Sequence, residues 1–313
     1  MAIDTNGLKL LCWAKSLGFS FRKTLTLGRQ GIIFNGRELR RVASQCGLKI
    51  TAEEVEQCFR RRPMTGCYAD GLFPFLGAEE VVTVDRSSFE GANFLHDLNE
   101  PFPAGMHGTF DMVIDGGTLE HIFDLPRALR HCMDLVKVDG HLIMVTAPAN
   151  SLMGHGFYQL SPEFFFRAFE PENGFRIEKI VIYSALGTHS RFFEITDPKI
   201  YQGRVELADS RPMHIAVIAK KIAEKEIFKI TPQQSDYAKE WELHENKTAE
   251  PQKRSGVIWE LRKRLNPYWP IWLRQLRSGV HSIGKGRTNT LSNASAYRQV
   301  LPNEFKTDSS GQR

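Results

Sequence analysis

Three aspartates close successive apolar segments of the sequence. Asp85 ends the run VVTVD, Asp97 follows a second short apolar stretch, and Asp115 ends the run MVID. Gly116 and Gly117 come directly after the third aspartate. A carboxylate at a strand end can accept hydrogen bonds from hydroxyl or amino groups, and glycines let the backbone approach a ligand closely. Solvated or turn-forming aspartates and a tight turn are the simpler alternatives. The pattern predicts a binding site for a polar ligand at one edge of a sheet.

Two histidines near these segments have the chemistry to move a proton or to bind a substrate. His155 stands between Gly154 and Gly156, beyond a further apolar run, and His121 follows the Gly-Gly pair. Imidazole titrates near neutral pH, which suits a general base or a substrate ligand. Tyr158 follows on the same loop and is placed to orient a polar substrate. A loop histidine that only shapes the pocket is the alternative for His155, and a satisfied structural histidine is the alternative for His121.

Residues 110–149 contain the elements that must position these side chains. In order they predict a strand, a loop, a helix, a turn and a second strand. Asp124 is expected to cap the helix, whose second position is Pro126. Parallel strands joined by a helix wind right-handed and bind ligands where the carboxyl ends of the strands open. We therefore expect the site at the ends of these two strands.

The rest of the first 222 residues extends the same pattern. Seven predicted strands alternate with helices, which is typical of a doubly wound α/β fold with a mostly parallel sheet. These strands are 23–27, 81–84, 93–96, 112–115, 142–146, 177–183 and 213–219. A chain of 313 residues has room for this domain and an appendage.

The composition changes after this domain. Residues 223–252 are charged and are expected to form a linker, 253–283 a basic aromatic helical segment, and 284–313 a disordered tail. Residues 253–287 carry nine Lys or Arg side chains against one acid, although the whole chain has a net charge of only +5. The basic character therefore belongs to the tail.

Three interpretations of residues 256–279 stay open. The segment is a helix packed on its own domain, an interfacial helix on an anionic membrane, or a nucleic-acid-binding element, and the last ranks lowest. The five cysteines are scattered, and the first twenty residues lack a secretory apolar region. We expect a cytoplasmic protein, with peripheral contact at the inner membrane surface if the segment binds lipid. The sequence leaves the oligomeric state open.

Several of these segments together resemble the class I S-adenosylmethionine-dependent methyltransferases. The resemblance covers residues 20–221 and is carried by VVTVD (81–85), HDLNEP (96–101), FDMVIDGGTLEH (110–121) and MHIAVIAKK (213–221). It implies a Rossmann-like sheet of strand order 3-2-1-4-5-7-6 with strand 7 antiparallel. It also implies S-adenosyl-L-methionine as the cofactor and places the insertion 184–212 over the substrate pocket.

The resemblance also assigns roles to single residues. Asp85 would accept hydrogen bonds from both ribose hydroxyls of the cofactor, and Asp97 would accept one from the adenine amino group. Leu98 would contribute to the same site. Asp115 and the two glycines after it, Gly116 and Gly117, would contact the rest of the cofactor.

The first glycine motif departs from the family pattern. An acid and three alternating glycines normally follow strand 1, but here Thr26 stands in the acidic position, Gly28 matches, and Gln30 and Ile32 replace the later glycines. Gly31 offers a shifted turn. The implied loop contacts with the cofactor therefore fall on Gly28, Gln30 and Gly31.

Two functions remain open at this point. The first is methyl transfer to a hydroxyl of a small polar or glycan-like acceptor, because the Asn-Pro-Pro-Tyr signature of amine methylation is absent after residue 114. This reaction requires no metal, and none is predicted. The second is a catalytically inactive binding or scaffolding protein of the same fold. A nicotinamide-dependent oxidoreductase lacks its G-x-G-x-x-G motif here.

Overall fold

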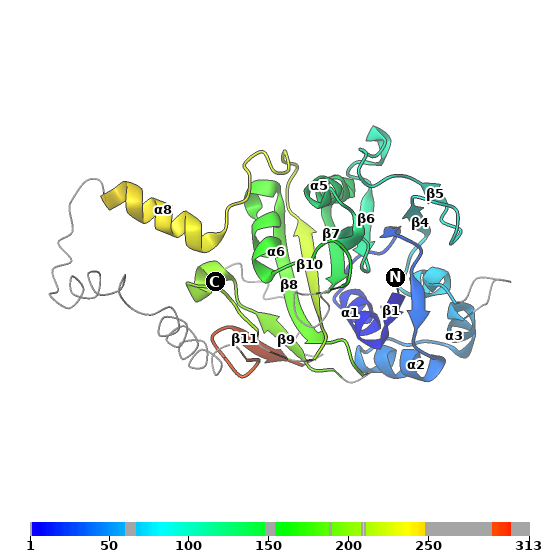
Figure 1. The fold of residues 1–313 in the computed structure, drawn as a ribbon. Helices are drawn as coiled ribbons and strands as arrows, with labels where there is room; N and C mark the ends of the chain where they lie inside the picture. The colour runs from blue at the N-terminus through cyan, green and yellow to red at the C-terminus, as the bar shows by residue number, and fades with distance from the viewer. Residues whose placement is uncertain are drawn as a thin grey trace.

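A large sheet runs through the computed structural model of the chain, which describes residues 2–59, 67–147, 154–187, 190–207, 209, 211–247 and 290–301. Within these residues the sheet has nine strands (Figure 1). In spatial order they are β11 (Tyr297–Val300), β9 (Phe192–Ile195), β8 (Phe175–Ser184), β10 (Met213–Lys221), β7 (Val136–Thr146), β6 (Phe110–Asp115), β2 (Lys23–Leu27), β4 (Glu80–Asp85) and β5 (Phe94–Leu95).

The order of the central strands defines the fold. From β5 to β8 the sheet reads β5-β4-β2-β6-β7-β10-β8, and β10 is antiparallel to both of its neighbours while the other strands run parallel. This is the order 3-2-1-4-5-7-6 with an antiparallel seventh strand. The predicted doubly wound α/β fold of the class I methyltransferases is confirmed.

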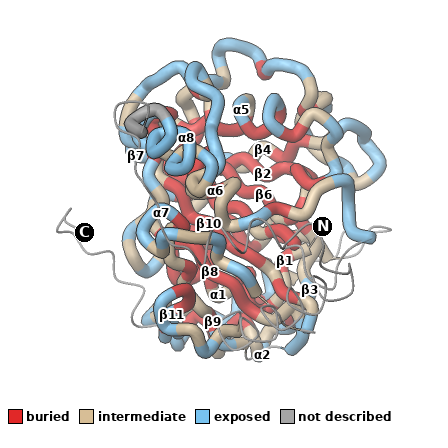
Figure 2. The backbone as a smooth tube through the Cα atoms, turned by 60° about the vertical axis from the view of Figure 1, so that its left-hand side comes forward, coloured by how far each residue is buried: buried red, intermediate tan, exposed pale blue. Residues whose placement is uncertain are grey.

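Helices cover both faces of the sheet. One face carries α1 (Thr5–Ser16), α2 (Gly36–Gln45), α3 (Ala52–Cys58) and α4 (Leu72–Phe75), and the other carries α5 (Leu125–Leu135) and α6 (Pro162–Ala168). The side chains of β6 alternate between two cores: Val113 packs with α5 and α6, whereas Met112 and Ile114 pack with α1. Burial on both faces explains the unbroken apolar character of this strand, which is buried along its whole length (Figure 2).

Smaller elements connect these layers. They are the two-stranded parallel sheet of β1 (Ala2–Asp4) and β3 (Gly31–Ile33), the helices α7 (Pro198–Tyr201) and α8 (Ser235–Lys247), and the short 3-10 turns η1 (Ala69–Gly71), η2 (Ala104–Met106), η3 (Leu119–His121) and η4 (Pro171–Asn173). None of the described helices combines the length and the apolar character that crossing a bilayer requires.

Asp124 is the N-cap residue of α5, as predicted, but its side chain does not cap the helix. The side chain of Asp124 makes no capping hydrogen bond and instead pairs with Arg127 at 3.0 Å. Pro126 does lie in the first turn, as predicted. The ion pair with Arg127, in the first turn of the helix, competes with the cap for the same carboxylate.

The end of the chain differs from the prediction of a wholly disordered tail. β11 lies within 284–313 and pairs antiparallel with β9, so that Tyr297 is opposite Ile195 and is buried. The expected linker 223–252 contains α8, which is held by an ion pair between Asp236 and Arg204. Residues 253–283, including 256–279, lie outside the described residues.

The insertion between β8 and β10 also differs from the expectation. The prediction placed 184–212 over a substrate pocket. Phe192–Ile195 of this segment form β9 beside β8 instead, whereas Ala185 at its start lines a cavity at the ends of β6 and β7. Val181 to Tyr183 of β8 supply the pairing partners. The unpaired edge of β8 favours this hydrogen bonding over an open loop.

Candidate active site

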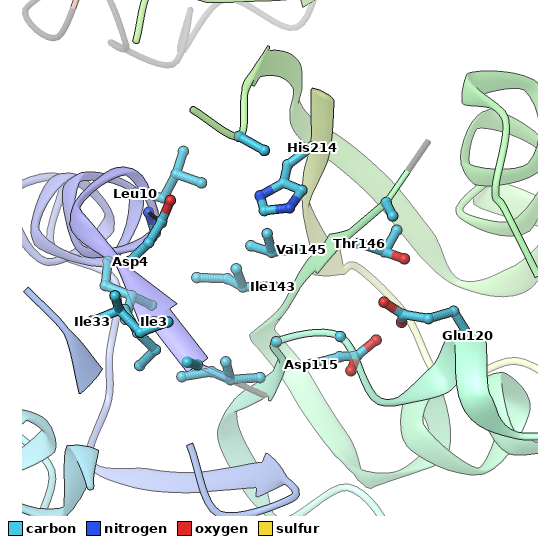
Figure 3. A pocket seen from close by; sticks show the side chains of 18 of the residues that line it. Ile3, Asp4, Leu10, Ile33, Asp115, Glu120, Ile143, Val145, Thr146 and His214 are labelled. Atoms are coloured by element: carbon cyan, nitrogen blue, oxygen red, sulfur yellow. Dashed lines mark hydrogen bonds between the residues drawn. The ribbon is translucent and has the colours of Figure 1, made fainter. Parts of the chain in front are cut away.

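A cavity of about 410 Å³ opens at the carboxyl ends of β6 and β7. Apolar side chains from α1, β6 and β7 form much of its wall, and polar groups gather at its ends (Figure 3). The polar lining residues are Asp4, Asp115, Glu120, His121, Thr146, His155 and His214. The cavity therefore lies at the sheet edge predicted from residues 110–149, and its size suits a small ligand.

Two buried carboxylates, those of Asp115 and Glu120, face one another at one end of the cavity (Figure 3). Asp115 is 0% exposed and Glu120 is 1% exposed. Oδ1 of Asp115 accepts a hydrogen bond of 2.7 Å from the backbone N–H of Thr118, whereas its Oδ2 has no partner among the described residues. Burial, and then the charge of Glu120, raise the pKa of Asp115 to about 7. Burial also raises the pKa of Glu120.

The two predicted histidines stand beside Glu120. Nε2 of His155 lies 3.6 Å from Oε1 of Glu120, and the rings of His121 and His155 are 5.0 Å apart. Burial, and then the nearby His155, lower the pKa of His121. The three residues come from one turn after β6 and from the loop beyond β7.

Glycines allow this loop to approach Glu120 closely. Gly156 has φ +72°, and a Cβ there would lie 2.7 Å from the backbone oxygen of Glu120. The same oxygen accepts hydrogen bonds from the N–H groups of Phe157 (2.8 Å) and Tyr158 (3.1 Å). Only glycine tolerates both the backbone conformation and the contact, so Gly156 fixes His155 against Glu120.

The tips of β4 and β5 form the neighbouring part of the sheet edge. Asp85 pairs with Leu95 in the sheet, which puts Asp85 and Asp97 on adjacent strand tips as predicted. The Asp97 carboxylate is 2.6 Å from Nη1 of Arg86 and accepts two hydrogen bonds from Asn99. These hydrogen bonds, and then Arg86, lower the pKa of Asp97. The Asp97 carboxylate is therefore ionised at neutral pH.

The loop after β2 closes the space between these two parts. Gly28 is left-handed at φ +70°, and Gly31 lies in β3 rather than in a cofactor loop. Gln30 is 1% exposed, and its Oε1 would lie 2.2 Å from a Cβ on Gly116. Arg29 is also buried, where it pairs with Asp70.

The structure brings five of the twelve predicted site residues together in one cavity. His121, His155, Asp115, Gly116 and Gly117 line one cavity. Seven predictions do not join this lining. Tyr158 donates its hydroxyl to the Phe123 carbonyl at 2.7 Å, and Leu98 is buried in the core. The others are Asp85 and Asp97 at the β4 and β5 tips and Gly28, Gln30 and Gly31 after β2. Tyr158 is thus occupied by a backbone contact.

Sequence reasoning missed the contribution of the two ends of the domain. Asp4 and His214 line the same cavity from β1 and β10. Asp4 also caps α1, accepting a hydrogen bond of 2.7 Å from Gly7. The sequence signal that could have located Asp4 is its position before an apolar helix, where aspartate is a common N-cap.

Comparisons with known proteins give similar folds and no close relative. No protein-family model and no curated protein matches the sequence. An S-adenosylmethionine-dependent methyltransferase from Mesorhizobium loti is similar over 68% of this chain and 100% of its own, with 17% identity and a TM-score of 0.35. A variant of the 16S rRNA (adenine(1408)-N(1))-methyltransferase from Catenulisporales acidiphilia is similar over 68% and 92%, with 12% identity and a TM-score of 0.34.

A third similar structure is the branched-chain polyamine synthase from Thermus thermophilus. It is similar over 73% of this chain and 60% of its own, with 13% identity and a TM-score of 0.33. The strand order and register of the sheet, rather than these similarities, define the fold of this chain.

Proposed function

We propose that this protein is an S-adenosylmethionine-dependent methyltransferase that methylates a hydroxyl of a small polar or glycan-like acceptor. One observation carries the proposal. In the methyltransferase strand order, Asp85 and Asp97 lie on adjacent strand tips, and a cavity with polar ends opens on the same edge of the sheet. Ligands of open α/β sheets bind at this edge.

Two buried acceptor atoms suit the amino-acid end of the cofactor. Oε1 of Gln30 and Oδ2 of Asp115 have no hydrogen-bond partner among the described residues, and both adjoin Gly116. Buried acceptors are normally paired, and an ammonium group donates three hydrogen bonds. When bound, the cofactor supplies a methyl group on a sulfonium sulfur. Gln30 and Asp115 would hold its ammonium group, and Asp85 and Asp97 its adenosine.

The acceptor side is the cavity at β6 and β7. A hydroxyl that receives a methyl group must lose its proton, so a group that binds or activates the oxygen is needed. His121 and His155 line this cavity. They can act in two ways: by accepting the proton, or by holding an ion that binds the oxygen.

Equilibrium binding of S-adenosylmethionine to the full chain tests the proposal. Asp85→Ala should weaken binding by about a hundredfold, because charge-assisted hydrogen bonds contribute about 1.5–3 kcal/mol each. Asp236→Ala is the control, since α8 lies at the opposite end of the molecule from β4 (Figure 1). The proposal fails if the protein does not bind the cofactor at millimolar concentration, or if Asp85→Ala leaves the affinity unchanged.

The second candidate is a binding or scaffolding protein without transfer activity. The packing of Gln30 against Gly116 favours it, as does the entry of the chain into β3 directly after the β2 loop. A cofactor pocket of this fold normally has a helix start at that point, where backbone N–H groups face the ligand. Absence of cofactor binding in the same titration would support this candidate.

A further inference from the structure

A carboxylate and two imidazoles converge at the end of the cavity. One ligand atom from each of Glu120, His121 and His155 lies within 4.8 Å of the other two. We propose that these three side chains bind one divalent transition-metal ion. The site was not predicted from the sequence, which has no recognisable spacing of metal ligands.

The separation of Glu120 and His155 fits two ligands of one ion better than it fits a hydrogen bond. Their nearest atoms, Oε1 and Nε2, are 3.6 Å apart, which is too long for a hydrogen bond. Two ligands at about 2.1 Å from a tetrahedral ion are about 3.4 Å apart. The side chain of His155 is 49% exposed, so it can make the small adjustment required.

Glu120 supplies a second, independent observation. Its side chain is 1% exposed, and Oε2 has no partner among the described residues. Figure 3 shows the carboxylate directed toward the cavity end, facing Asp115. Buried carboxylates are normally paired or bind a metal. A cation at this point would satisfy the free oxygen and reduce the repulsion between the two acids.

The backbone holds the three ligands together before any ion binds. His121 follows Glu120 directly in η3, and two backbone hydrogen bonds to the carbonyl of Glu120 fix the loop that carries His155. Gly117 and Gly156, both with positive φ, allow the close approach on either side. Sites held in this way lose little entropy on binding.

The donor set selects the class of metal. Two imidazole nitrogens and one carboxylate oxygen suit Zn²⁺, Fe²⁺ or Co²⁺, whereas Mg²⁺ and Ca²⁺ prefer oxygen ligands. Three protein ligands also leave at least one position open, as in catalytic metal sites.

The role of this ion rests on the proposed function, but its binding does not. Such an ion would leave a coordination position for the acceptor oxygen, and binding there would lower the pKa of the hydroxyl. The two histidines would then act as ligands and not as proton acceptors.

The test is titration of the untagged, chelator-treated full chain with Co²⁺, followed by visible absorption, and competition with Zn²⁺. We expect one ion per chain. Glu120→Gln and His155→Ala should each lower the affinity at least about a hundredfold, because even outer partners of metal ligands contribute 10–100-fold. His107→Ala, in the η2 region, is the matched control and should leave the affinity unchanged.

The outcomes separate this proposal from the proposed function. Equal Co²⁺ affinity in wild type, Glu120→Gln and His155→Ala overturns the metal site, provided that circular dichroism shows folded variants. Binding of Co²⁺ by a protein that does not bind S-adenosylmethionine supports the metal site and refutes methyl transfer. Binding of S-adenosylmethionine by a protein that takes up no Co²⁺ refutes the metal site alone.

Discussion

The carboxyl edge of the sheet has two halves, one at β4 and β5 and one at β6 and β7. Their acidic side chains differ in whether they have hydrogen-bond and ion-pair partners. At β4 and β5, Asp97 is paired with Arg86 and bonded to Asn99. At β6 and β7, Asp115 and Glu120 are buried against each other, and each keeps an oxygen without a partner among the described residues. The first half is complete without a ligand, whereas the second is not.

This difference indicates which half of the sheet edge gains more free energy when a ligand binds. Two adjacent buried carboxylates raise the free energy of the folded chain, as the raised pKa of Asp115, about 7, shows. A cationic group that enters the cavity relieves this cost. The half at β6 and β7 therefore gains most from a cationic group, whereas the acids at β4 and β5 are the proposed acceptors of hydrogen bonds from the adenosine.

The largest expected effect on the stability of the fold comes from a substitution in the loop after β7. In Gly156→Ala the new Cβ would meet the Glu120 backbone oxygen at 2.7 Å in a left-handed conformation. We expect a loss of about 2 kcal/mol in the free energy of unfolding, measured with urea. Gly154→Ala, two residues away with nothing within 4 Å of its Cβ, should change it by less than about 0.5 kcal/mol. Equal losses in the two variants would show that the contact does not fix the loop.

A smaller effect, on the affinity for the cofactor, is expected at Gln30 in the loop after β2, between the two halves. Gln30→Ala removes an amide oxygen assigned to the cofactor, and it should weaken S-adenosylmethionine binding about tenfold in calorimetry, the value of one hydrogen bond. Gln45→Ala, exposed at the end of α2, is the control. Tighter binding by Gln30→Ala would mean that Gln30 blocks the cofactor instead of holding it.

The smallest effect on the free energy of unfolding is expected from breaking the Arg86–Asp97 pair at β4 and β5. Arg86 is 79% exposed in its side chain, so solvent screens its pair with Asp97, and Arg86→Ala should cost about 0.5 kcal/mol or less at pH 7. Because the pKa of Asp97 is lowered in the folded chain, its stabilisation is present above pH ~4 and is lost as the pH falls further. Urea unfolding at pH 7 and pH 3 measures both. A difference between wild type and variant that grows in acid would contradict this sign.

Elements whose contacts are local in the chain could be predicted from the sequence. The unit of β6, α5 and β7 was predicted because its apolar periodicity and its turn residues lie within forty positions. The contiguous Asp115-Gly116-Gly117 turn was placed correctly at the cavity for the same reason. The order of the sheet came from the resemblance, since pairing between distant strands leaves no local pattern.

Long-range contacts account for what was missed. β1 pairs with β3, and β11 with β9, across separations that strand patterns do not encode. The cluster of Glu120, His121 and His155 was missed because His155 lies beside Glu120 only in the folded chain. The position of the cap at Asp124 was predicted, but its side-chain hydrogen bond was not formed because the carboxylate pairs with Arg127 instead.

The pairing of β11 with β9 has a consequence for how the chain is made. Arg298 and Glu194, which bond across these strands, are 104 residues apart. As the ribosome releases the chain from its N-terminus, β9 emerges long before its partner and presents an unpaired edge. The nascent protein therefore exposes this edge to association with other chains while the residues between β9 and β11 are synthesised, and a stop codon shortly before Tyr297 would make that exposure permanent.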